Sequence, residues 1–210
     1  MRLVSAYYND TGPFMEMGVF DDFISTDNFA DLRAGDVLVS WGGEDISPSL
    51  YNHVNVASYA PEQPSQRDAI EWALMKQARD LGIPIIGVCR GAQMLCALAG
   101  GHLIQHVNGH GGNHTVLTYD GDDFVTNSIH HQMMYPFDVE HELLAWTPNR
   151  SDVYIQAEGS ITIDDIPPSV DPEYVYYQSV KGFAIQWHPE MMHDNCRATQ
   201  YIFKTFKERL

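Results

Sequence analysis

The sequence of 210 residues is poor in positive charge, in cysteine and in long apolar runs. Lys and Arg together number 12 against 28 Asp and Glu, which gives a formal net charge of −16. Because a phosphate backbone or an anionic membrane surface is bound by clustered cations, we expect neither nucleic acid nor a membrane as a partner. No apolar run approaches the roughly 18 residues of a membrane-spanning helix, and no apolar signal core follows Met1.

The three cysteines are odd in number and widely spaced, so they predict no disulfide framework. A reducing, cytoplasmic compartment fits this usage best. Hydrophobic residues make up 44% of the chain and charged residues 19%, as in an ordinary globular protein. The length suits a single domain over residues 1–210, whose core needs no disulfide or metal to hold it.

Strand and helix patterns alternate through the first half of the chain. The apolar run 36–41, closed by a Gly-Gly pair, predicts a buried strand, and the run 83–88 predicts a central parallel strand. Between these strands, Ser65 and Asp68 form the pattern of a capping box, and apolar residues at helical spacing continue to a stop at Gly82.

A further helix is predicted over 89–99, and the second half of the chain is richer in strands. Strands are expected over 114–119, 124–129, 143–146, 153–157, 174–177 and 183–187. The chain closes with an amphipathic helix whose apolar face carries Ala198, Tyr201, Ile202, Thr205 and Phe206. The predicted fold is therefore an open, mostly parallel α/β sheet flanked by helices, with extra antiparallel strands in the second half.

A glycine-framed cysteine stands at the junction of the central strand and the helix that follows it. The segment 87–91 reads G-x-C-x-G around Cys89. A sharp turn of this kind lifts a nucleophile above the sheet, and the helix N-terminus beneath the sulfur favours the reactive thiolate. The glycines are needed where side chains would collide with the neighbouring strand and helix. Taken alone, Cys89 could equally be a small buried hydrophobic residue.

A base and an acid lie together near the end of the chain. His188 and Glu190 are two residues apart at the end of a predicted strand and can point to one side, with Pro189 stiffening the backbone between them. A thiol nucleophile needs such a base, and the base needs an acceptor that orients it. Alone, this segment would suggest only a surface turn; together with the cysteine turn it predicts a catalytic triad.

The two motifs together resemble class I glutamine amidotransferases, and the match is closer to γ-glutamyl hydrolases, including γ-glutamyl-γ-aminobutyrate hydrolases of the peptidase C26 type. Further segments carry the resemblance: the stretch 41–51, Arg67-Asp68, Gly82-Ile83-Pro84 and the stretch 127–132. The matching segments run from about Asp36 to Glu190. The family implies a flavodoxin-like three-layer fold with the site at the carboxyl ends of the central strands.

The resemblance also implies a role for each matching residue. Cys89 would form a γ-glutamyl thioester, His188 would move the proton and Glu190 would hold His188. The backbone N–H groups of Gly43 and Arg90 would form the oxyanion hole, in which one donor is typically worth on the order of 10²–10³ in rate. The residues that would contact the glutamyl group are Gln93, His130, His131 and Gln132. No cofactor is implied, and the Arg90 side chain is expected in a structural salt bridge.

Three functions are compatible with this pattern. The first is a free-standing hydrolase acting on a small γ-glutamyl substrate, either glutamine or an N-substituted glutamine. The second is a glutaminase subunit that delivers ammonia to a separate synthase. The third is a non-catalytic binding protein on the same scaffold, which a complete triad speaks against.

A series of histidines invites a metal interpretation. His102, His106, His110 and His114 recur every four residues. Glycines interrupt any continuous helix there, and no carboxylate or thiol pattern joins the series, so we predict no metal site. Cys96 is expected to pack toward the sheet, and Cys196 to be inert.

Overall fold

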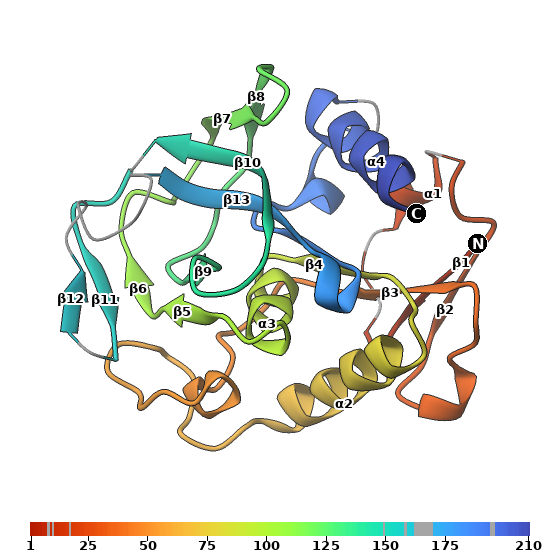
Figure 1. Ribbon diagram of the computed structural model, residues 1–210, viewed down its shortest axis with the longest axis horizontal. Coiled ribbons are helices and arrows are strands. Elements are labelled where there is room, and N and C mark those ends of the chain that lie inside the picture. Colours follow the sequence, from red (N-terminus) through yellow and green to blue (C-terminus); the bar gives the residue numbers. More distant parts are fainter. Residues whose placement is uncertain are drawn as a thin grey trace.

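The computed structural model describes residues 1–7, 9, 11–16, 18–148, 150–157, 159–161, 170–193 and 196–210. Within these residues the central sheet has nine strands in the order β2-β1-β3-β4-β14-β13-β10-β7-β8 (Figure 1). The first five strands of that order are parallel: β2 (Asp22–Ser25), β1 (Arg2–Ser5), β3 (Asp36–Ser40), β4 (Ile85–Val88) and β14 (Gly182–Ile185). The remaining four continue it antiparallel: β13 (Val170–Tyr177), β10 (Glu142–Pro148), β7 (His114–Thr118) and β8 (Asp123–Thr126).

Two small antiparallel sheets and four α-helices complete the described structure. One small sheet pairs β12 (Gly159–Ile161), β11 (Tyr154–Gln156) and β6 (His106–Val107), and the other pairs β5 (His102–Ile104) with β9 (Met133–Tyr135). The α-helices are α1 (Gly12–Met15), α2 (Gln66–Asp80), α3 (Arg90–Leu98) and α4 (Arg197–Arg209). Single 3-10 turns lie at Phe29–Asp31, Pro48–Tyr51, Gln178–Val180 and Pro189–Met191. No described helix has the length and apolar character needed to cross a membrane.

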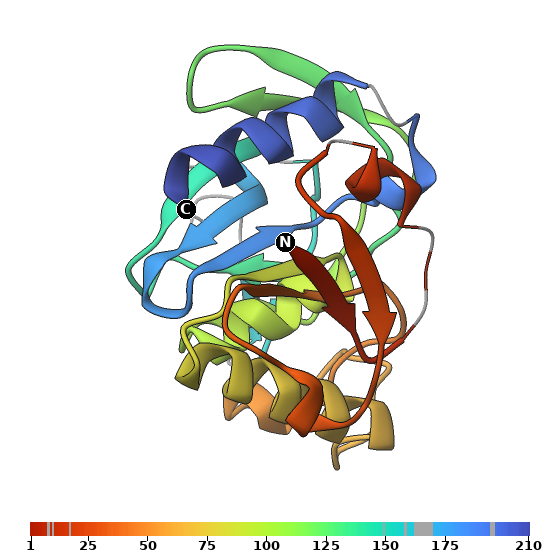
Figure 2. The same cartoon turned by 90° about the vertical axis from the view of Figure 1, so that its right-hand side faces the viewer.

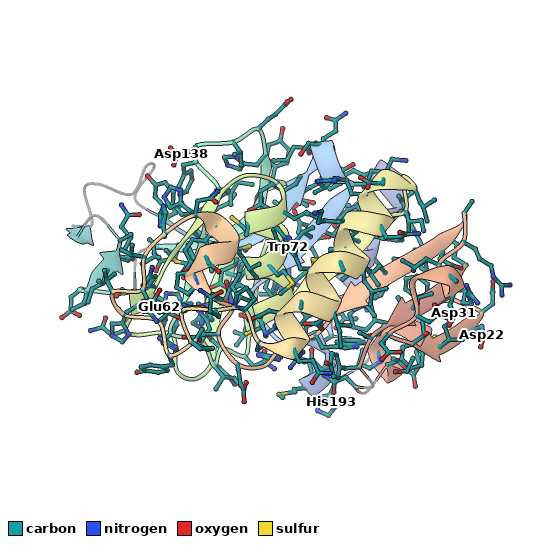
Figure 3. All side chains as sticks on the ribbon, turned by 90° about the horizontal axis from the view of Figure 1, so that it is seen from below. Asp22, Asp31, Glu62, Trp72, Asp138 and His193 are labelled. Atoms are coloured by element: carbon teal, nitrogen blue, oxygen red, sulfur yellow. The ribbon has the colours of Figure 1, made fainter. Side chains whose placement is uncertain are left out.

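The helices cover both faces of the central sheet (Figures 1 and 2). Alternate residues of β3 and β4 point to opposite faces, as the period of a strand requires. Val39 and Val88 pack in one core with Phe14 of α1 and Phe206 of α4. On the other face, α2 and α3 enclose a second core, to which Trp72 of α2 (labelled in Figure 3) adds a half-buried side chain. Strands buried on both faces explain why 83–88 is a continuous apolar run.

Helix α2 begins and ends where its sequence signals lie. The Ser65 side chain accepts a hydrogen bond from Asp68 N at 3.0 Å, and the Asp68 carboxylate accepts one from Ser65 N at 2.9 Å. This reciprocal pair satisfies two N–H groups that the first turn leaves open. Past the helix end, Gly82 has φ +66°, a conformation that glycine adopts without strain.

The predicted fold is confirmed: a sheet with a parallel half and an added antiparallel half, flanked by helices. The expected strands of the second half correspond to β7, β8, β10, β11, β13 and β14, with ends that differ by a few residues. The prediction missed β2, α1 and the short strands β5, β6, β9 and β12. Strands of two or three residues are too short to show a period, so the chain itself gives little sign of them.

Candidate active site

Cys89 stands in a strained turn between β4 and α3. Its backbone has φ 50° and ψ −104°, a region that residues with a side chain rarely occupy. Conformations of this kind persist only where the surrounding structure enforces them, and they gather at functional sites. Cys89 is 5% exposed and occupies the N-cap position of α3, so the sulfur lies at the positive end of the helix.

The glycines on either side of Cys89 allow α3 to start directly against the sheet. A Cβ on Gly87 would lie 2.4 Å from the Gly91 carbonyl oxygen, and a Cβ on Gly91 would lie 2.1 Å from the Ser40 carbonyl oxygen. Both contacts are with backbone that cannot move aside. The collision predicted from the G-x-C-x-G pattern is therefore confirmed, and only glycine fits at either position.

His188 lies between Cys89 and Glu190. Its Nδ1 is 2.8 Å from Glu190 Oε1, which leaves Nε2 available, and His188 and Cys89 line the same hollow. Burial lowers the pKa of His188, but the hydrogen bonds with the thiol and the carboxylate outweigh burial and raise the pKa to about 10. A protonated imidazole thus lies beside the sulfur at neutral pH. The ends of β4 and β14, which are paired in parallel, bring these groups together.

Asn127, which follows β8, hydrogen-bonds both the backbone N–H and the backbone carbonyl of His188. Its Nδ2 donates to the His188 carbonyl at 2.9 Å, and its Oδ1 accepts from His188 N at 2.8 Å. The antiparallel half of the sheet thereby positions His188. Asn9 Nδ2 lies 3.5 Å from Glu190 Oε1 on the N-terminal side of the site.

The loop after β3 passes so close to His188 and Arg67 that a side chain at Gly42 or Gly43 would collide with one of them. A Cβ on Gly42 would lie 2.4 Å from His188 Cε1 and 3.5 Å from Cys89 Cβ. Gly43 has φ +154°, and a Cβ there would meet the Arg67 guanidinium at 2.3 Å. The Gly-Gly pair therefore lets backbone approach the thiol and imidazole, as an oxyanion hole requires.

A buried ionic cluster supports this loop from below. Arg90, which is fully buried, pairs with Asp68 at 2.5 Å and with Glu71. Arg67 Nε contacts Glu71 at 3.2 Å, and its Nη2 donates to the Gly42 carbonyl at 3.0 Å. The expectation that Arg90 has a structural side chain is confirmed. Two arginines meet two carboxylates, so the cluster is neutral as a whole.

Two hollows lie in this part of the structure, and Cys89 lines the first of them. One, of about 350 Å³, is lined by Asn9, Gly42, Gly43, Cys89, Ile129, His188, Glu190 and Met191. The other, of about 470 Å³, is lined by Glu44, Asp45, Tyr59, Ala60, Pro61, Ser65 and His131. Residues close in sequence line the two hollows: Gly43 and Ile129 line the first, and Glu44 and His131 line the second.

The four predicted glutamyl contacts lie near the site but differ in exposure. His131 lines the second hollow, where its Nε2 contacts Asp45 Oδ1 at 2.9 Å and its ring stacks on Tyr59. Gln93 is buried and donates to the Gln132 carbonyl at 3.0 Å, and His130 Nδ1 contacts the same oxygen at 2.8 Å. Among the described residues, the Gln132 amide finds no partner. Burial, together with the neighbouring His110, lowers the pKa of His130 well below its usual range.

The four histidines at positions 102, 106, 110 and 114 have different partners in the structure. The expectation that no carboxylate joins them was wrong. His102 contacts Asp138, and His106 contacts His131. His110 and His114, however, meet carboxylates from β13: His110 Nε2 is 2.9 Å from Asp171, and His114 Nε2 is 2.7 Å from Glu173. The ligand atoms of His110, His114 and Glu173 lie within 4.8 Å of one another and could hold a metal ion. The carboxylates are about 60 residues away along the chain, so spacing alone could not reveal them.

Two residues that hold the site in place, Asn127 and Glu71, are not predicted from the sequence. Asn127 belongs to the segment 127–132 that carries the family resemblance. Nothing in the sequence indicates that its side chain contacts His188. Glu71 lies three residues after Asp68 on α2, and this helical spacing puts both carboxylates on one face. That spacing was a signal that could have predicted the pair around Arg90.

The chain is similar in sequence and in fold to several known proteins. A family model described as Peptidase C26 matches residues 30–121. Protein NtpR of Enterococcus hirae is 29% identical over 194 residues, which cover 81% of this chain and 73% of that protein. The glutamine amidotransferase-like protein YvdE of Lactococcus lactis is 27% identical over 196 residues, which cover 83% and 74% respectively. The solved structure of PurLQS from Thermotoga maritima shares the fold, with a TM-score of 0.59 at 15% identity over 99% of this chain and 97% of that one.

These matches show that the chain is similar to proteins of the class I glutamine amidotransferase-like superfamily and, over residues 30–121, to peptidase C26. Within that superfamily, the relatives indicate a glutamine amidotransferase-like hydrolase.

Proposed function

We propose that this protein is a free-standing, cysteine-dependent hydrolase of γ-glutamyl amide bonds. The observation that carries the proposal is that Cys89, His188 and Glu190 line one hollow, with His188 Nδ1 2.8 Å from Glu190 Oε1 and Cys89 at a strained turn. The pair of an imidazolium and a thiolate at a helix N-terminus is the arrangement that prepares sulfur for attack on a carbonyl.

The reaction runs in two halves. The Cys89 thiolate attacks the amide carbonyl carbon, and the N–H groups of Gly43 and Arg90 stabilise the oxyanion. His188 gives its proton to the departing amine, the C–N bond breaks and a γ-glutamyl thioester remains. His188 then takes a proton from water, the hydroxide displaces the sulfur, and glutamate is released. Glu190 holds the imidazole in place throughout.

The glutamyl group would lie on the side of Gln93 and the 130–132 segment. Gln93 and His130 hold the backbone of this segment, and His131 faces open space. We propose that these residues and Gln132 form the wall against which the glutamyl moiety binds. The amide carbonyl oxygen, which becomes negatively charged when the thiolate attacks, would then face the Gly42–Gly43 loop.

The test is steady-state release of amine from L-glutamine and from N-substituted γ-glutamyl amides by the isolated chain. We expect turnover of substituted amides, and we expect Cys89→Ala to abolish it while the far-ultraviolet circular dichroism spectrum stays unchanged. Turnover retained in Cys89→Ala would refute the mechanism.

A glutaminase subunit is the second candidate function. Ile129 and Met191 are each 62% exposed at the rim of the hollow that holds Cys89. Exposed apolar side chains at the mouth of a site are a place where another protein can dock. In that case the isolated chain would turn over glutamine weakly or not at all, and added synthase would raise the rate.

A further inference from the structure

A buried cluster of two histidines and two carboxylates joins the start of β7 to β13. His110 precedes β7 and His114 begins it, while Asp171 and Glu173 belong to β13. All four side chains lack exposed surface. The cluster shares no residue with the candidate triad, and the proposed reaction makes no use of it.

The two carboxylates of the cluster are buried without a lysine or an arginine. In the described part of the chain, the ion pairs of Asp171 and Glu173 are with His110 and His114 only. Buried negative charge is costly unless positive charge lies beside it. Two protonated imidazoles or one divalent cation would balance two carboxylates, and the way in which His110 is held favours the cation.

His110 has one ring nitrogen anchored and the other without a hydrogen-bond partner. Its Nε2 lies 2.9 Å from Asp171 Oδ2, and Asp171 in turn accepts hydrogen bonds from Arg150 N and Tyr154 OH, both at 2.9 Å. Its Nδ1 has no partner among the described residues and lies 3.7 Å from Glu173 Oε1. A carboxylate that orients one nitrogen of a histidine while the other binds the ion is the usual support of a metal-ligating histidine.

His114 and Glu173 complete a set of three ligands. His114 Nε2 is 2.7 Å from Glu173 Oε1, and ligand atoms of these two residues and His110 all lie within 4.8 Å of one another. Ligands about 2.0–2.1 Å from a tetrahedral ion are roughly 3.3 Å apart, so small side-chain rotations would bring all three to bonding distance. Glu173 Oε2 also lacks a partner among the residues that the structure describes, whereas buried polar atoms are nearly always paired with protein, water or an ion.

We propose that His110 Nδ1, His114 Nε2 and Glu173 bind one Zn²⁺ ion, and that Asp171 orients His110. Two imidazoles and one carboxylate are a ligand set that zinc takes in proteins, with water or a further group as the fourth ligand. This inference replaces the expectation of no metal site. The carboxylates that the sequence pattern lacks come from β13, which is distant along the chain.

The ion would fasten the segment that positions His188. The His110 carbonyl accepts hydrogen bonds from Ser128 Oγ at 2.8 Å and from His130 N at 3.3 Å. Asn127, the neighbour of Ser128, holds the backbone of His188. We therefore expect a structural ion that stabilises the fold and takes no part in the chemical step.

The first test is titration of the chelator-treated full chain with ZnCl₂, followed by calorimetry and by thermal unfolding. We expect one Zn²⁺ per chain, and a Tm raised by roughly 5–10 °C at a free Zn²⁺ concentration about 100 times Kd. MgCl₂ should give no such rise, because Mg²⁺ prefers oxygen ligands.

Four variants separate this site from other places where zinc could bind. His114→Gln should weaken Zn²⁺ binding by at least about 100-fold, and Asp171→Asn by about 10-fold to 100-fold. His102→Gln is the matched control, since it removes a histidine of the same series that contacts Asp138 instead. Cys89→Ala should bind Zn²⁺ as the parent does, whereas an ion held by the candidate triad would be lost.

The parent protein supplies the result that does not depend on a variant folding. Anomalous diffraction at the zinc edge, from crystals grown with ZnCl₂, should place one ion within about 2.3 Å of His110 Nδ1 and His114 Nε2. An ion at another place, no Zn²⁺ binding by the parent, or equal affinities of His114→Gln and His102→Gln would overturn the inference. These readouts are independent of amine release, so the proposed hydrolase function would stand or fall separately.

Discussion

Replacing Gly42 with alanine should disable the base without unfolding the protein. The added Cβ would lie 2.4 Å from His188 Cε1 and 3.2 Å from its Nδ1. Carbon atoms in contact rest about 3.5 Å apart, so the imidazole must withdraw by about 1 Å. A displacement of that size at a reacting group costs on the order of a hundredfold in rate, and we expect kcat to fall by about that factor.

The assay is amine release from the best γ-glutamyl amide, with the urea unfolding midpoint measured beside it. Gly42 has no positive φ, so alanine adds no backbone strain and the midpoint should move little. Gly111→Ala is the matched control, because a Cβ there meets nothing within 4 Å and φ is again not positive. If Gly42→Ala keeps the kcat of the parent protein, the placement of His188 against this loop is wrong.

Three further predictions concern the groups around the base. Asn127→Ala removes both hydrogen bonds to the backbone of His188 and should lower kcat by roughly 10-fold to 100-fold with little change in KM, whereas Asn127→Asp, which keeps the acceptor, should recover part of the rate in the same assay. Glu71→Gln leaves buried Arg90 short of negative charge and should lower the free energy of unfolding by on the order of 3 kcal/mol. Asp120→Asn removes one partner of an exposed ion pair and should lower the free energy of unfolding far less. If urea titrations gave the same decrease for both variants, the role of the buried cluster would be contradicted. Because the pKa of His188 is raised from 6.5 to about 10, its protonation stabilises the fold fully below pH 6.5 and this contribution is lost as the pH rises through about 10. Between pH 6.5 and about 10 the free energy of unfolding of the parent protein should therefore fall relative to that of His188→Gln. If the two proteins showed the same dependence on pH, the imidazole would not be held by its partners.

Local sequence signals predicted the elements that hold the candidate site. The capping box at Ser65 and the stop at Gly82 mark α2, because the groups that end a helix are its own neighbours in the chain. The apolar run before Cys89 marks β4, and the glycines around the cysteine mark the sharp turn. Each of these features is decided within a few residues, so one sequence is enough to show them.

Contacts between distant segments could not be predicted in the same way. His110 and His114 meet Asp171 and Glu173 only because β7 and β13 both flank β10 in the folded sheet. The contact of Asn127 with His188 likewise spans 61 residues. Such pairs depend on the order of strands in the sheet, which periodicity does not reveal.

The identity of the nucleophile is the central claim, and the three cysteines allow it to be tested within one chain. Burial raises the pKa of Cys96 to about 12, and Cys196 lies at the start of α4. The most direct measurement is turnover of a γ-glutamyl amide by the single alanine variants, with the site of labelling by an electrophilic glutamine analogue mapped by peptide mass spectrometry. The account predicts label on Cys89 alone, and loss of turnover only in Cys89→Ala. Label on Cys196, or full turnover by Cys89→Ala, would contradict it.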